Sequence, residues 1–191
     1  MKKYLSIILG IILTACLVAC GSSDKGTLND NEQAIISNQE VSDTEEQELS
    51  VENQQTEKDA EADIFEIIPE NMYTADDLNY NDDNCRANQE MNDDSARPAI
   101  SNDLSVVSEY DVIYLGYPIW WGTAPRIIQT FIENYDISGA TVYMFCTSGG
   151  SGIESSISDL QMLYPDINIV DGKRLNDATE TDIREWIESL N

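Results

Sequence analysis

Two continuous apolar runs stand out in the hydrophobic pattern of the chain, at residues 112–115 and 141–146. Runs without polar alternation are typical of strands that are buried on both faces of a parallel sheet. Apolar residues at helical spacing follow each run, in stretches that begin near residues 125 and 153. Shorter patterns predict a strand at residues 63–68, a short helix at 102–107, an edge strand at 167–170 and a helix at 183–190. This alternation predicts an α/β fold with a parallel sheet.

The stretch after the first run carries two adjacent tryptophans. Residues 116–118, Gly-Tyr-Pro, predict the end of the strand, and Pro125 suits a first helical turn because its missing N–H costs nothing there. Trp120 and Trp121 therefore belong to the carboxyl end of the strand, where open α/β sheets bind ligands. Adjacent side chains point apart, so at least one tryptophan should face a ligand or solvent. Trp186, on the apolar stripe of the last helix, is predicted to lie in the core.

A glycine- and serine-rich loop at residues 147–152 follows the second run. The helical spacing that begins at Ile153 makes this loop another strand-to-helix turn. Glycines allow a ligand to approach the main chain closely, because they have no Cβ. The loop therefore offers backbone N–H groups and hydroxyls at the same end of the predicted sheet.

The N-terminus has the pattern of a secretory signal. Lys2 and Lys3 precede an apolar stretch at residues 4–18, which is short for a membrane span. The small residues that end it, followed by Cys20, resemble a bacterial lipobox, which implies cleavage before Cys20 and a diacylglyceryl group on its sulfur. We therefore expect a signal peptide at residues 1–19 and a protein held by its lipid on the outer side of a bacterial membrane. A plain signal peptide or an uncleaved anchor is the alternative.

Two regimes of composition follow the signal. Residues 20–61 are rich in Ser, Asn, Gln, Asp and Glu and cannot bury enough apolar surface to fold, so they are expected to form a disordered acidic linker. Residues 62–191 are enough for one domain with a single core. Within them, residues 70–96 are rich in Asn and Asp but lack the spacing of a calcium loop, so a solvated surface loop and no metal site are predicted.

Charge and composition exclude several functions. The chain carries a formal net charge of −26, and such a surface repels nucleic acid. It contains no histidine, which excludes Ser-His-Asp and Cys-His catalysis and histidine zinc sites. Cys85 and Cys146 would be able to pair in an oxidising compartment, but the simpler interpretation is two unpaired thiols, with Cys146 buried in a strand.

Four segments together resemble the flavodoxin-like family, and most closely the lipoprotein-type flavodoxins of bacteria: residues 117–125, 145–152, 79–84 and 95–100. The resemblance extends over residues 62–191. It implies a three-layer sandwich around a parallel sheet of strand order 2-1-3-4-5, for which flavodoxin itself is the standard example, with FMN at the switch point of the strand order.

The resemblance also implies a set of FMN-binding residues. The residues expected to flank the isoalloxazine ring are Pro118, Ile119, Trp120, Trp121, Gly122 and Thr123, with one tryptophan stacked on it or along its edge. The residues expected to donate N–H groups and hydroxyls to its polar edge are Thr147, Ser148, Gly149, Gly150 and Gly152. No residue is assigned a catalytic role.

One part of the family pattern is not found. Flavodoxins begin with a strand and a phosphate-binding loop at the start of the first helix. No strand-length apolar run lies between Cys20 and Asp63, and residues 55–62 look like the remnant of that helix. The first βα unit is therefore predicted to be missing. Losing four charge-assisted hydrogen bonds would cost about 6 kcal/mol, roughly a 10,000-fold weakening of FMN binding.

The function expected from these features is electron transfer by a lipid-anchored FMN protein. Its partner would be a redox protein or a small-molecule acceptor, and not nucleic acid. Two alternatives remain: an FMN-dependent reductase of quinones or similar acceptors, and a degenerate, non-redox surface lipoprotein. Nearby acidic groups would disfavour an anionic reduced flavin and so lower its potential.

Overall fold

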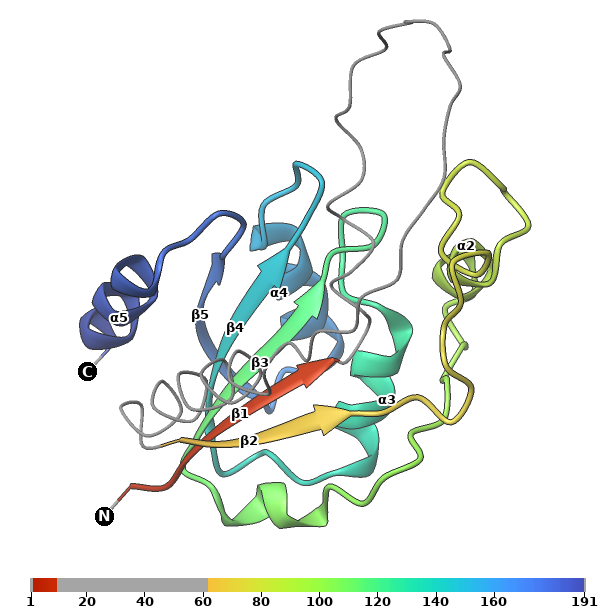
Figure 1. The fold of residues 1–191 in the computed structure, drawn as a ribbon. Helices are drawn as coiled ribbons and strands as arrows, with labels where there is room; N and C mark the ends of the chain where they lie inside the picture. The colour runs from red at the N-terminus through yellow and green to blue at the C-terminus, as the bar shows by residue number, and fades with distance from the viewer. Residues whose placement is uncertain (1, 10–61, 191) are drawn as a thin grey trace, which may run out of the picture. The chain divides into compact units, whose positions relative to one another are not determined.

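The structure is a computed structural model that describes residues 2–9 and 62–190 of the 191-residue chain. Its centre is a five-stranded sheet in which every neighbouring pair is parallel. The order along the sheet is β2 (Ala62–Ile67), β1 (Tyr4–Leu9), β3 (Val112–Pro118), β4 (Thr141–Thr147) and β5 (Asn168–Arg174). Figure 1 shows the five strands side by side with their carboxyl ends at one rim. This is the α/β, flavodoxin-like arrangement expected from the sequence.

The first strand is present, and the prediction that it is missing is wrong. β1 pairs with β2 on one side and β3 on the other, so that Ile7 lies opposite both Phe65 and Leu115. Leu5 and Ile7 are fully buried. The error has a physical cause: an apolar run after two lysines has the composition of a signal segment and also that of a central parallel strand, which shows no alternation.

The basic residue before β1 is also part of the fold. The Lys3 backbone N–H donates to Asp111 Oδ2 at 2.8 Å, and the Lys3 Nζ lies 3.0 Å from Glu109 Oε2. The Asp111 N–H donates in turn to the Lys3 carbonyl at 3.0 Å. These contacts set the register of β1 against the start of β3. The predicted signal cleavage point, the linker and Cys20 lie outside the described residues.

Helices cover both faces of the sheet, as a three-layer sandwich requires. α3 (Arg126–Asn134) and α4 (Glu154–Leu163) pack on one face, where their apolar residues join those of β1, β3 and β4 in the main core. α5 (Glu180–Ser189) packs on the other face, where Trp186 contacts Tyr114 edge-on at 6.2 Å between ring centroids. Trp186 is therefore a core residue, as predicted.

Most of the Asn/Asp-rich segment is exposed, as expected of a solvated surface loop, but the segment also has structure that was not predicted. It contains the helix α2 (Arg86–Asn92) and a small core of its own, and it returns to the sheet through an antiparallel bridge between Pro69 and Ile100. The residues of the segment that form this small core are Tyr73, Cys85, Ala87 and Met91, which pack around Trp120. We call residues 70–99 the insert. The structure of the insert is hard to predict from the sequence because only a few apolar residues stabilise it, and they are spread among many polar ones.

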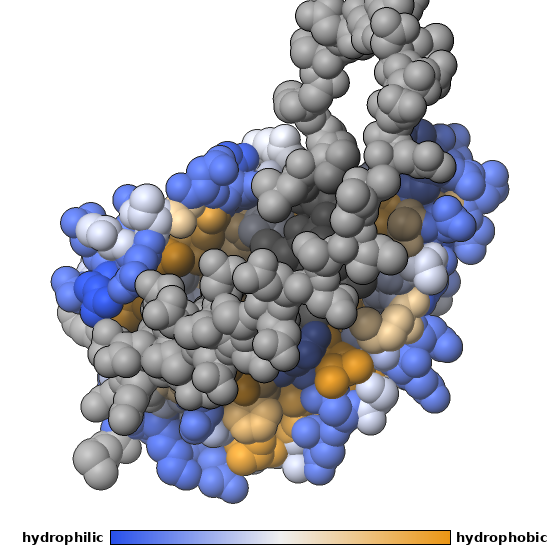
Figure 2. All heavy atoms as spheres, in the orientation of Figure 1, coloured by the Kyte–Doolittle hydropathy of each residue, from blue (hydrophilic) through white to orange (hydrophobic). Residues whose placement is uncertain are grey.

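The remaining elements lie close to where they were predicted. The short helix before β3 is a 3-10 helix at Ser105–Glu109, a few residues later than expected. β5 is an edge strand, and its Val170 is exposed. Hydrophilic residues dominate the visible rim of the described part, in keeping with the charge of −26 (Figure 2). Among the described residues, no helix is long and apolar enough to cross a membrane.

Candidate functional site

The two loops singled out in the sequence lie next to each other at the carboxyl rim of the sheet. β3 and β4 pair in register up to Pro118 and Thr147, their last residues. Just beyond, the Ile119 N–H donates to the Thr147 carbonyl at 2.8 Å. The aromatic turn that follows β3 and the Gly/Ser loop that follows β4 therefore start from a shared hydrogen bond and border the same part of the rim.

The aromatic turn is tight and reverses the chain within two residues. Trp120 and Thr123 exchange two backbone hydrogen bonds, each of 3.0 Å. Between them, Trp121 has a φ of 46° and Gly122 a φ of 87°. Positive φ at both central positions is the geometry of a type I′ turn, which favours glycine and is unusual for tryptophan. Holding a tryptophan there costs of order 1–3 kcal/mol, and such strain is typical of functional positions.

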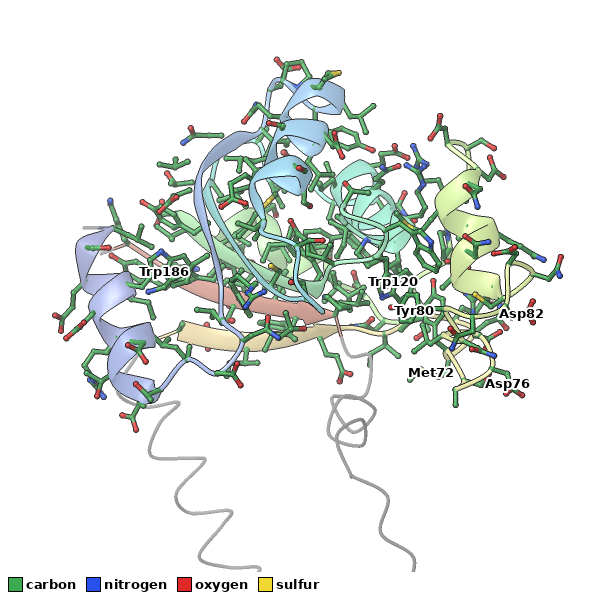
Figure 3. All side chains as sticks on the ribbon, turned by 90° about the horizontal axis from the view of Figure 1, so that it is seen from above. Met72, Asp76, Tyr80, Asp82, Trp120 and Trp186 are labelled. Atoms are coloured by element: carbon green, nitrogen blue, oxygen red, sulfur yellow. The ribbon has the colours of Figure 1, made fainter. Side chains whose placement is uncertain are left out.

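This turn gives the two tryptophans opposite environments, as adjacent positions require. Trp120 is 1% exposed and packs edge-on against Tyr73 of the insert, with 5.1 Å between ring centroids. Trp121 is 47% exposed, and its ring lies 4.9 Å from that of Tyr80, which is 57% exposed. Figure 3 shows Trp120 and Tyr80 in the same part of the molecule, with Trp186 at the far end of the sheet. Trp121 is thus the tryptophan that can offer a ring face to a ligand.

The Gly/Ser loop is held by a residue from a third loop. The Ser148 N–H donates to Asn176 Oδ1 at 2.8 Å, and the Asn176 amide donates back to the Ser148 carbonyl at 3.0 Å. The Ser148 hydroxyl donates to the Ser151 carbonyl. The Ser148 N–H, predicted as a ligand donor, is therefore occupied. Gly149 and Gly150 are exposed, and a Cβ at either position would meet nothing within 4 Å.

The remaining predicted residues frame these two features. Thr147 and Gly152 are exposed on the Gly/Ser loop, whereas Pro118, Gly122 and Thr123 are partly buried around the aromatic turn. Ile119 is also partly buried and packs against the main core. The structure thus brings all the predicted residues to one rim, where Trp121, Gly149, Gly150 and Gly152 are exposed and Trp120 is buried.

Buried polar contacts stiffen the rim from below. The Tyr117 hydroxyl and the Ser156 hydroxyl lie 2.9 Å apart, which ties β3 to the first turn of α4. Burial raises the pKa of Tyr117 well above its ordinary value, so its hydroxyl stays neutral. Cys85 and Cys146 are separate buried thiols, which confirms the simpler interpretation. Burial raises the pKa of Cys146 to about 11, so this thiol is also neutral at pH 7.

Two residues of the rim were missed in the sequence. Asn176 follows β5 in a stretch with no distinctive pattern, and only the fold brings it to Ser148. Tyr80 lies in a run of Asn and Asp residues, where a single aromatic residue was the available signal. Among the described residues, no group of three or more His, Cys, Asp or Glu is placed to hold a metal ion.

Comparison with known protein families decides the classification. A family model described as Flavodoxin matches residues 44–190, well over half of the chain. This chain belongs to the flavodoxin family. The match includes both rim loops and the insert, whereas β1 lies outside it. No curated protein matches the chain.

Solved structures of flavoproteins resemble this flavodoxin along most of its length. A flavoprotein from Bacteroides uniformis is 33% identical, with 98% of each chain covered and a TM-score of 0.71. One from Bacteroides eggerthii is 41% identical over 73% of this chain and 88% of its own, with a TM-score of 0.67. A flavoprotein from Lactobacillus acidophilus, solved in complex with FMN, is 19% identical over 72% and 89% of the two chains, with a TM-score of 0.52, and shares the fold.

The described residues of this flavodoxin suit the ring end of a flavin. The exposed indole of one loop and the two open glycines of the neighbouring loop offer a flat apolar surface and main chain without an overlying side chain, which a planar ring with a polar edge requires. The phosphate end would be bound after β1, outside the described residues. There the sequence runs Gly-Ile-Ile-Leu-Thr-Ala, which supplies one side-chain hydroxyl.

Proposed function

We propose that this flavodoxin binds FMN at the rim between the β3 and β4 loops and transfers electrons. The observation that carries the proposal is the 2.8 Å hydrogen bond between Ile119 and Thr147, because it joins the loop that carries Trp121 to the loop that carries Gly149 at the ends of two paired strands. Family membership and the FMN complex of the Lactobacillus acidophilus neighbour support FMN as the cofactor. FMN supplies one- or two-electron redox chemistry when it is bound.

The residues of the rim have roles that follow from their positions. Trp121 offers its exposed ring for stacking, and the Gly149 amide is available to donate to the polar edge of the ring. The Gly150 N–H donates to the Ser148 hydroxyl at 3.4 Å. Asn176 holds the Gly/Ser loop in this shape. The predicted flavin-binding residues contain no group that titrates near neutral pH. Such a site favours electron transfer over a reaction that needs an acid or a base.

Titration of the full chain with FMN tests this function. Stacking on Trp121 should quench flavin fluorescence, and Trp121→Ala should weaken binding by about 3- to 10-fold, the range for one aromatic contact. Val170→Ala, on the far edge strand, serves as the matched control. A folded wild-type chain that leaves flavin fluorescence unchanged would support a non-redox protein instead. Steady turnover with a nicotinamide donor would identify a reductase.

We further propose that Cys20 is the lipid-attachment site that places the protein on the outer side of a bacterial membrane. The small residues before Cys20 and the basic, apolar leader support it. The fold adds a consequence: cleavage before Cys20 would remove β1 together with the leader. Two long strands, β2 and β3, would then lose their shared neighbour, and their open edges would invite aggregation.

The lipid-anchored form is therefore expected to differ in folding from the uncut chain. Labelling with a radioactive fatty acid in a bacterial host, with Cys20→Ala as the control, detects the modification. Circular dichroism and thermal unfolding then compare the full chain with a chain that starts at Cys20. No label on the wild-type chain would overturn the anchoring. Equal unfolding of the two chains would show that β1 is not needed for the fold.

A further inference from the structure

The exposed indole of Trp121 is held in a way that its own turn does not explain. Trp121 is 47% exposed on a backbone with a φ of 46°, a strained conformation of the kind that is typical of functional positions. The two backbone hydrogen bonds of the turn set its main chain but leave the ring free to rotate. The ring contact with Tyr80, at 4.9 Å and an interplanar angle of 52°, is what restricts it.

Hydrogen-bonded turns in the insert hold Tyr80 at this contact. The Asn79 N–H donates to the Asp76 carbonyl at 3.2 Å, and the Asp82 N–H donates to the Asn79 carbonyl at 2.9 Å, so one turn ends at Asn79 and Tyr80 lies in the next. The Asn81 N–H donates to the Asn79 side chain at 3.2 Å. Asn and Asp are favoured in such turns because their side chains bond nearby backbone groups. The Asn and Asp residues of this segment thus stabilise the turns that expose the ring of Tyr80.

The insert that carries Tyr80 is anchored on both sides of the Trp121 turn. One residue before Trp121, Trp120 enters the core of the insert against Tyr73. Shortly after the turn, Arg126 donates to the Met91 carbonyl at 2.9 Å and forms an ion pair of 2.6 Å with Asp94. These two anchors fix the distance between the insert and the aromatic turn.

We propose that Tyr80 is a positioning residue that backs the indole of Trp121 and so forms one wall for an uncharged planar ring, the isoalloxazine end of a flavin. This inference rests on the proposed function. Acidic residues of the insert near this wall indicate which end of the ligand would lie here. Asp76 and Asp82 lie in the same region of the insert as Tyr80 (Figure 3), and their charges would disfavour an approaching phosphate. The ring end of the ligand, rather than its phosphate, would therefore lie beside the insert.

The experiment compares FMN and riboflavin binding to the full chain and to Tyr80→Ala and Tyr80→Phe. Loss of the backing ring should weaken both ligands by the same factor, about 3- to 10-fold. Tyr80→Phe keeps the ring and should bind as the wild type does. Met72→Ala, exposed in the same insert, is the matched control. Equal binding by wild type and Tyr80→Ala, or an equal loss in Tyr80→Phe and Tyr80→Ala, would overturn the positioning role.

A second readout does not depend on flavin. Acrylamide quenching of tryptophan fluorescence should rise in Tyr80→Ala, because the indole of Trp121 loses the ring that shields one side. The rise should be absent when Trp121→Phe is present in both chains. If the wild-type chain binds no flavin and the quenching still rises, the proposed function fails while the Tyr80–Trp121 contact stands. If the quenching is unchanged, the positioning role fails whatever the chain binds.

Discussion

β1 and β3 lie side by side in the middle of the sheet and both contribute fully buried side chains to the core, yet only β3 was recognised as a strand in the sequence. Ile7 of β1 and Ile113 of β3 are both fully buried, and Leu5 lies directly opposite Ile113 in the register. Both strands are short apolar runs without alternation. The difference lies in their surroundings. β3 leads into a Gly-Tyr-Pro turn, two tryptophans and a helix start, whereas β1 follows two lysines at the N-terminus.

The comparison shows that a central parallel strand carries little information of its own. Its apolar composition is shared with signal segments and buried helices, so the flanking residues decide how it is interpreted. β3 is followed by a Gly-Tyr-Pro turn and a helix start, and these residues indicate that a strand has just ended. The lysine before β1 looks like the start of a leader, although in the structure its main chain and side chain bond Asp111 and Glu109.

The sharpest test places the same charge in both strands. Ile7→Asp and Ile113→Asp each bury an unpaired carboxylate in the centre of the sheet, which should cost about 5 kcal/mol or more and prevent folding. Urea unfolding of the purified full chains, followed by circular dichroism, measures the effect. Val170→Asp on the exposed edge should stay within about 0.5 kcal/mol of wild type. A folded Ile7→Asp chain beside an unfolded Ile113→Asp chain would show that β1 is dispensable.

The next largest expected effect is a difference in stability between substitutions at two adjacent residues after β3. Trp120→Ala should lose about 3–5 kcal/mol of stability, because it leaves a cavity between the sheet and the insert. Trp121→Ala should change stability by less than about 1 kcal/mol, since its ring is half exposed and the alanine keeps the strained backbone. Thermal unfolding of both variants measures the contrast. Similar losses in the two would mean that the indoles share one environment.

The same contrast shows which parts of the site could be read from the sequence. Residues carried by their own strand, such as Trp121 and Gly149, could be predicted because strand ends meet at one rim of a parallel sheet. Asn176 and Tyr80 could not, because they come from a later loop and from the insert and reach the rim only through tertiary packing. The insert was missed because its stability depends on single contacts, such as Tyr73 with Trp120, spread through a polar stretch.

Substitution of Arg126, which anchors the insert to α3, is expected to have a moderate effect on stability. Arg126 is 9% exposed and bonds the carbonyls of Glu90 and Met91, at the end of α2, as well as Asp94. Arg126→Met keeps the length of the side chain but leaves these carbonyls without their donor, at a cost of about 1–3 kcal/mol. Hydrogen exchange should rise in α2 and leave β3 unchanged. Equal exchange in α2 would contradict the anchoring role.

The smallest effect concerns the far end of α3, and it depends on pH. Glu133 accepts from Arg97 at 2.8 Å and from the Tyr164 hydroxyl at 2.6 Å. The hydrogen bond from Arg97 lowers the pKa of Glu133 below its ordinary value of 4.5, with a further contribution from Tyr164. A carboxylate with a lowered folded pKa stabilises the fold above 4.5, and this stabilisation is lost as the pH falls through the folded pKa.

Glu133→Gln should therefore lower the free energy of unfolding by about 0.5 kcal/mol at pH 7, the size expected of a solvent-exposed ion pair. The difference from wild type should shrink toward zero in acid, because the wild-type carboxyl is then also neutral. Urea unfolding at both pH values measures it, and added salt should reduce the effect at pH 7. A difference that grows in acid would mean that Glu133 is stabilised in its neutral form, and that the contact with Arg97 is not an ion pair in solution.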